Sequence, residues 1–95
     1  MVHLSEESHV CKEAVETFGK DRQILMFIEE CGELFQAISK NNRGMEANIA
    51  EEVADVEIML EQIKHIFKCH NEVNKWKNKK IVRLCHRVEE FKKIS

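Results

Sequence analysis

The chain has 95 residues, enough for one domain spanning 1–95 with a single modest hydrophobic core. The absence of Pro and Tyr, the presence of only three Gly, and the many Glu, Lys, Leu and Ile residues favour an all-α fold over a β-sheet. The net charge is −2, and no stretch approaches the length of a transmembrane helix. We therefore expect neither a nucleic acid polymer nor a membrane as a partner.

The first predicted helix starts at a cap on Ser5 and ends near Phe18, where Gly19 breaks it. A second helix then runs from a cap on Asp21 to about Lys40. The expected inner face of the first helix consists of Val10, Cys11, Ala14, Val15 and Phe18.

The third helix is expected to start at Asn48, because Glu51 follows three residues later in a capping arrangement, although Glu46 is an alternative start. It should continue to about Cys69. The second and third helices both carry apolar residues at alternating steps of three and four. These are Ile24, Ile28, Cys31, Phe35 and Ile38 in the second, and Ile49, Val53, Val56, Leu60, Ile63 and Phe67 in the third.

A turn at Asn71 precedes a fourth helix over about 72–93. Trp76 on its apolar stripe could stack on a nucleobase, but a lone Trp in such a stripe is more typical of a core or a subunit interface, which we favour. The expected inner positions are Val73, Trp76, Ile81, Leu84, Val88 and Phe91.

Charge is unevenly distributed along these helices. Residues 1–71 carry 7 basic and 14 acidic side chains, net −7, whereas residues 72–95 carry 8 basic and 3 acidic, net +5. An acidic body with a basic final helix suits a site that holds a cation and an anionic substrate together. It suits plain salt bridges between helices equally well.

Two pairs of acids lie on the second and third predicted helices, Glu30 with Glu33 and Glu52 with Asp55. Residues three apart project from one side of a helix, with Cβ atoms roughly 5–6 Å apart. Glu30 and Glu52 also occupy rows that are otherwise apolar. These rows are Phe27, Glu30, Leu34 and Ala37, and Glu52, Val56, Met59, Ile63 and Ile66.

Four carboxylates that converge at the edge of a core lose hydration and repel one another, so either their pKa values rise or a cation neutralises them. Oxygen ligands favour a hard cation, and Mg²⁺ is the expected ion. A solvated acidic face is the ordinary explanation of a single Glu-x-x-Glu pair. Two pairs on core-type rows of neighbouring helices favour a metal site.

The pattern Glu-x-x-Glu, a spacer, and then Glu-x-x-Asp within the segment 48–62 resembles the MazG-like all-α nucleoside triphosphate pyrophosphohydrolases, in their short stand-alone form. The resemblance covers about residues 20–67 well and the last helix loosely. It implies a four-helix bundle. Two helices with apolar residues on several sides also suggest that association into a homodimer or homotetramer completes this bundle. The resemblance also implies an enzyme that hydrolyses an NTP or dNTP to the monophosphate and pyrophosphate.

The same resemblance implies that four acids bind Mg²⁺ and form the catalytic centre: Glu30, Glu33, Glu52 and Asp55. One of them, or the neighbouring Glu29 or Glu51, would orient or deprotonate the attacking water. Lys80 and Arg83 on the last helix would bind the triphosphate, although a solvated basic face explains them as well. The sequence does not distinguish these options.

Other side chains are weaker candidates. Lys40 and Arg43, before the third helix, are further basic residues within reach of a phosphate. The pairs Cys69-His70 and Cys85-His86 suggest zinc, but adjacent residues on a helix diverge and no zinc-ligand spacing is present. The four cysteines form no Cys-x-x-Cys pair and the N-terminus lacks the pattern of a secretory signal, so we expect reduced thiols and a cytoplasmic protein.

The competing interpretation is a non-catalytic helical interaction or regulatory module that retains the acidic cluster. The positions of Glu30 and Glu52 argue against it, because a carboxylate on a core-type row is destabilising without a cation. Base and sugar preference depend on the shape of a pocket, and no residue in this sequence indicates a base-specific contact.

Overall fold

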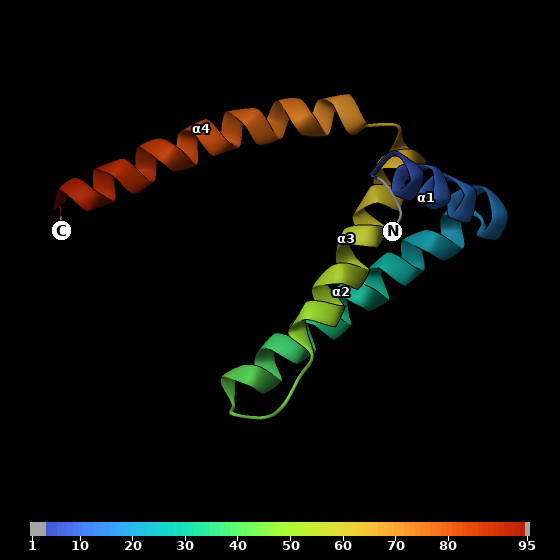
Figure 1. Ribbon diagram of the computed structural model, residues 1–95, viewed down its shortest axis with the longest axis horizontal. Helices are drawn as coiled ribbons and strands as arrows, with labels where there is room; N and C mark the ends of the chain where they lie inside the picture. Colours follow the sequence, from blue (N-terminus) through green and yellow to red (C-terminus); the bar gives the residue numbers. More distant parts are fainter. Residues whose placement is uncertain (1–3, 95) are drawn as a thin grey trace.

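Four α-helices make up the described part of the chain, residues 4–94 of the computed structural model (Figure 1). They are α1 (Leu4–Phe18), α2 (Lys20–Asn42), α3 (Ile49–Phe67) and α4 (His70–Ile94). No strand occurs within these residues, which confirms the prediction of an all-α protein with four helices. None of the four helices is long and apolar enough to cross a membrane.

The helices α2 and α3 form the main packed pair, lying side by side and joined at one end by the loop 43–48 (Figure 1). At the other end of this pair α1 packs against both helices. Cys11 anchors α1, because it is buried and its thiol donates a hydrogen bond to the carbonyl oxygen of Ile58 over 3.7 Å. The buried side chains among the described residues are Cys11, Gln23, Ala37, Met59 and Gln62.

The inner surfaces of α2 and α3 follow the rows expected from the sequence. On α2 the row through Glu30 is half-buried and ends in the buried Ala37, and on α3 the row through Glu52 is half-buried around the buried Met59. The apolar series predicted on α2 does not form its inner surface, because three of its members, Ile28, Phe35 and Ile38, are exposed. The acids therefore face the helix interface while several large apolar side chains of α2 face away from it.

Helix starts depend on local hydrogen bonds. The prediction of a cap at Asn48 is confirmed, since its Oδ1 accepts a hydrogen bond from the backbone N–H of Glu51 at 3.2 Å. The predictions at Asp21 and Ser5 are wrong in position, because both residues lie inside the first turn of their helices. Gly19 takes the capping position of α2 with φ 92°, a backbone conformation that is open to glycine and strained for residues with a Cβ.

The turn between α3 and α4 comes earlier than expected. α3 ends at Phe67 and α4 begins at His70, so the predictions of a third helix reaching Cys69 and of a turn at Asn71 are both wrong by about one half-turn of helix. Lys68 adopts a left-handed conformation with φ 52° and ψ 47°, and the N–H of Cys69 returns to the carbonyl oxygen of Lys64 at 3.1 Å. Because lysine is an unusual residue at this position, the sequence carries no signal for the turn.

The last helix, α4, extends away from the body formed by α1, α2 and α3 (Figure 1). It contains no buried residue, and Trp76 is 60% exposed. Its expected inner positions are therefore not inside a single chain, and only Val73 among them is half-buried. Val10 and Phe18 of α1 were also expected inside and are exposed.

Candidate metal centre

The packing of α2 against α3 brings the four predicted acids together, and we call Glu30, Glu33, Glu52 and Asp55 the acid site. Glu30, Glu33 and Glu52 each offer a carboxylate oxygen, and these oxygens lie within 4.8 Å of one another. Glu51, Glu52 and Asp55 form a second such group. Glu52 belongs to both groups, so it is the centre of the carboxylate cluster.

Two oxygen atoms of the acid site are buried without a hydrogen-bond partner among the described residues, Oε2 of Glu30 and Oε2 of Glu52. A buried polar oxygen without a partner is costly, and a buried carboxylate more so than a neutral group. The two helices each contribute one of these oxygens. A group that satisfied both would therefore also stabilise the contact between α2 and α3.

The electrostatic environment of these carboxylates is unfavourable for their charged forms. Loss of hydration raises the pKa of Glu30 above its ordinary value, and repulsion from Glu33 and Asp55 raises it further. The pKa of Glu52 is also raised, first by loss of hydration and then by repulsion from Glu33, Asp55 and Glu51. Both shifts have the direction expected of carboxylates that are crowded together and partly removed from water.

The donor chemistry fits a hard divalent cation. Every ligand atom offered is a carboxylate oxygen, as Mg²⁺ prefers, and the two unpartnered oxygens supply a reason for an ion to bind there. The acid site can hold such an ion between α2 and α3, and because Glu33 is exposed, one side of the site is open to water and to a ligand.

The two acids named as possible bases for water activation differ in their surroundings. Glu51 is exposed and belongs to the second carboxylate group, and its Oε2 accepts a hydrogen bond from Nδ2 of Asn48 at 3.2 Å. Glu29 is exposed and lies in neither carboxylate group of the described residues. The geometry therefore favours Glu51 over Glu29.

The predicted substrate-binding residues are not next to the acid site in a single chain. Lys80 and Arg83 are exposed on α4, which leads away from α2 and α3 (Figure 1). Lys80 instead places its ammonium 6.0 Å from the ring centre of Trp76. Lys40 and Arg43 line a shallow hollow at the end of α2, about two helical turns beyond Glu33.

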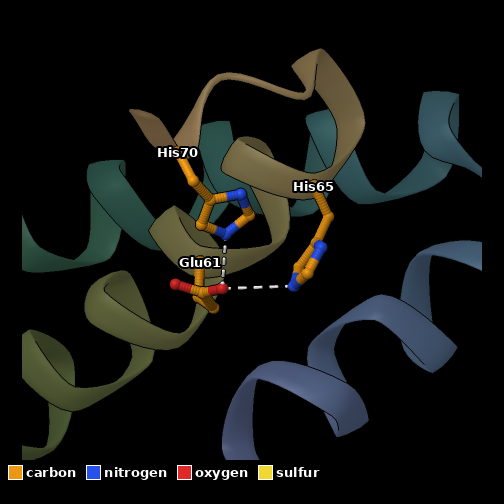
Figure 2. A group of neighbouring side chains, drawn as sticks. All are labelled: Glu61, His65 and His70. Atoms are coloured by element: carbon orange, nitrogen blue, oxygen red, sulfur yellow. Dashed lines mark hydrogen bonds and ion pairs between the residues drawn. The ribbon is translucent and has the colours of Figure 1, made fainter. Parts of the chain in front are cut away.

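Sequence reasoning missed a second polar group, Glu61, His65 and His70, which we call the histidine cluster (Figure 2). Oε2 of Glu61 lies 3.1 Å from Nε2 of His65 and 2.7 Å from Nε2 of His70. Ser8 of α1 donates a hydrogen bond to the same oxygen over 2.9 Å. The i, i+4 spacing of Glu61 and His65 was a signal in the sequence that these two side chains share a helix face. The early turn that places His70 next to Glu61 had no such signal.

No family model matches the chain, and no curated protein and no solved structure matches it either.

Proposed function

We propose that this protein is a Mg²⁺-dependent nucleoside triphosphate pyrophosphohydrolase of the MazG-like type. It would convert an NTP or dNTP and water to the monophosphate and pyrophosphate. The observation that carries the proposal is the pair of buried, unpartnered oxygens on Glu30 and Glu52, one from each helix of the acid site. An ordinary solvated acidic face would leave such atoms in water.

In this proposal Glu30, Glu33, Glu52 and Asp55 hold the cation between α2 and α3. Bound there, Mg²⁺ would offset the negative charge of the phosphate oxygens and of the transition state. Glu51, exposed at the rim, orients a water molecule and accepts its proton as the water oxygen attacks the α-phosphorus. The bond from the α-phosphorus to the bridging oxygen breaks, and pyrophosphate leaves.

We propose further that the active form is a homodimer or homotetramer. A single chain leaves large apolar side chains exposed on all four helices, among them Leu25 and Phe35 on α2 and Trp76 on α4. So many exposed large apolar side chains are more typical of proteins that associate than of monomers. Association would also let the basic α4 of one chain supply Lys80 and Arg83 to the acid site of another, which completes the four-helix bundle between chains.

The test is hydrolysis of a panel of NTPs and dNTPs, with Mg²⁺ and then with EDTA, measuring pyrophosphate and phosphate separately. We expect pyrophosphate only in the presence of Mg²⁺. Glu52→Gln should abolish its release, whereas Glu57→Gln, on the same helix but outside both carboxylate groups, should not. Phosphate as the sole product, or full activity of Glu52→Gln, would contradict the proposal.

A second function has one observation in its favour, the 25-residue α4 without a single buried residue. Such a helix suits a non-catalytic interaction module that docks α4 on a partner. The two functions differ in the effect of Glu52→Gln. If the protein is an interaction module, the unchanged protein should not hydrolyse nucleotides, and Glu52→Gln should fold as well or better. If it is an enzyme, Glu52→Gln should lose Mg²⁺ binding and activity.

A further inference from the structure

The histidine cluster brings together three potential metal ligands from different parts of the chain (Figure 2). Glu61 and His65 are one turn apart on α3, so their side chains lie on the same side of the helix. The left-handed Lys68 reverses the chain directly afterwards, and His70, the first residue of α4, returns to Glu61. One carboxylate oxygen and two imidazole nitrogens all lie within 4.8 Å of one another.

We propose that Glu61, His65 and His70 bind one borderline divalent transition metal ion of the Zn²⁺ class. Two imidazole nitrogens and a carboxylate oxygen are the donors that Zn²⁺ takes in sites with an open fourth position. The acid site offers oxygen atoms alone, and it suits a hard ion instead. The two groups of ligands therefore differ in the kind of metal that each selects.

The two distances to Glu61 require only a small adjustment. The two nitrogens, of His70 and His65, are 2.7 and 3.1 Å from Glu61 Oε2, which are hydrogen-bond lengths. Neighbouring ligand atoms of a tetrahedral Zn²⁺ ion lie roughly 3.4 Å apart, as follows from metal–ligand bonds of about 2.1 Å. The two nitrogen–oxygen distances would each lengthen by less than about 1 Å, and the two nitrogens, which lie within 4.8 Å of each other, would take up the remaining ligand positions after small side-chain rotations.

The cluster is reachable from solvent. His65 and His70 line one surface hollow, of about 670 Å³, and Ser8 and Glu61 line a neighbouring one. Their side chains are only partly buried, with 38% exposure for His70, 26% for Glu61 and 17% for His65. The hydroxyl of Ser8, 3.0 Å from Nε2 of His65, or a water molecule could fill the fourth position.

An ion at this position would have a structural consequence. Glu61 and His65 belong to α3, His70 to α4, and Ser8 to α1, so the ligands and their neighbour join three helices. α4 has few other contacts with the body (Figure 1). A bound metal ion would therefore hold the start of α4 and with it the direction in which that helix leaves the body.

The alternative is that protons alone hold the cluster together, with His70 and the Ser8 hydroxyl donating hydrogen bonds to Glu61, and with His65 paired with the Glu61 carboxylate and hydrogen-bonded to Ser8. The two possibilities differ in their response to added metal. Calorimetric titration of the metal-stripped protein with Zn²⁺, in excess Mg²⁺ and with a reductant that does not bind metal, should show one Zn²⁺ ion per chain. His65→Gln and His70→Gln should each weaken this binding at least about tenfold, because each removes one ligand.

Two controls separate this site from others. His86→Gln changes an exposed histidine of α4 outside the cluster, and Cys69→Ser removes the thiol next to His70; both should leave Zn²⁺ binding unchanged. Co²⁺ in place of Zn²⁺ should give a spectrum without a thiolate charge-transfer band. His70 is at the first position of α4 and its side chain is more exposed than that of His65, 38% against 17%, so His70→Gln tests the site even if His65→Gln fails to fold.

The proposal would be overturned if Zn²⁺ did not bind in excess Mg²⁺. It would also be overturned if the folded His70→Gln bound Zn²⁺ as tightly as the unchanged protein, or if Cys69→Ser abolished binding.

Discussion

The side-chain amide of Gln23 donates a hydrogen bond to Oε1 of Gln62 over 2.7 Å, across the interface between α2 and α3. Each glutamine is only 6% exposed, as little as the apolar side chains around which the helices pack. A buried amide pair of this kind fixes which turns of two helices lie opposite each other, because a shift along either axis would break the bond. The same pairing of turns holds the acid site together.

Breaking this pair should destabilise the protein. Gln23→Leu leaves the Gln62 amide buried without its partner, and the free energy of unfolding should fall by about 1–3 kcal/mol. Gln62→Leu should have a similar effect. The double variant should lose less than the sum of the two, because neither unpaired amide remains, and urea unfolding of all four proteins measures the coupling. Additive losses would show that the bond contributes nothing beyond packing.

The raised pKa of Glu52 predicts a dependence of stability on pH in EDTA. Because the folded-state pKa lies above the ordinary value of 4.5, the folded chain retains a proton that the unfolded chain releases. The stability contributed by protonated Glu52 is fully present below the ordinary value of 4.5, and it is lost as the pH rises through the raised pKa of the folded state. The groups facing Glu52 are also carboxylates, Glu33 on α2 and Glu51 and Asp55 on α3.

Glu52→Gln should therefore be more stable than the unchanged protein at neutral pH in EDTA, and the difference should shrink as the pH falls towards 4.5. Thermal unfolding of both proteins across this range checks the prediction. The matched control is Glu57→Gln, which changes an exposed acid on the same helix and should show no such trend. A stability advantage that grew on acidification would contradict the assigned direction of the shift.

Addition of Mg²⁺ should stabilise the protein, because the ion binds the folded acid site and not the separated acids of the unfolded chain. At a concentration one hundred times the dissociation constant, the gain should be about 2.7 kcal/mol. The melting temperature, measured at one fixed protein concentration, should rise when Mg²⁺ is added and should return to its starting value when EDTA removes the ion. Glu30→Gln and Glu52→Gln should both lose most of the rise, since each replaces a negatively charged carboxylate that has a buried oxygen with a neutral amide.

Replacing either of two glycines by alanine should change the free energy of unfolding, in opposite directions at the two positions. Gly19 has φ 92°, so Gly19→Ala should lower the free energy of unfolding by about 1 kcal/mol or more through backbone strain. Gly32 lies inside α2, and Gly32→Ala should raise it by roughly 0.5–1 kcal/mol through helix propensity. Neither new Cβ would meet another atom within 4 Å, so packing does not mask either effect. Chemical denaturation of the two variants provides the comparison.

The proposed self-association predicts a sensitivity at Phe35, which is 69% exposed on α2. Phe35→Lys should shift the protein from a dimer or tetramer towards the monomer in sedimentation experiments, because an interface does not tolerate an unpaired buried charge. Gln36→Lys, at the neighbouring exposed position, is the control for charge alone. A monomeric starting protein, or an unchanged assembly in Phe35→Lys, would contradict the role of this face.

Several features could be read from residue order because they are local. The four helices follow from apolar spacing and from the absence of Pro, and the cap at Asn48 follows from Glu51 three residues later. The acid pairs share a helix face because residues three apart always do. The prediction that Glu30 and Glu52 stand on core-type rows depended on the same periodicity, and the structure places both rows at the α2–α3 interface.

Tertiary structure decided the features that depend on residues far apart in the chain or on one unusual backbone angle. The register of α2 against α3 brings Glu30 close to Asp55 and buries Gln23 on Gln62, and no local pattern specifies which turns meet. The left-handed Lys68 brings His70 to Glu61 and sends α4 away from the body, although lysine carries no preference for that conformation. Local periodicity sets which faces of a helix are apolar, but only packing between helices determines what those faces contact.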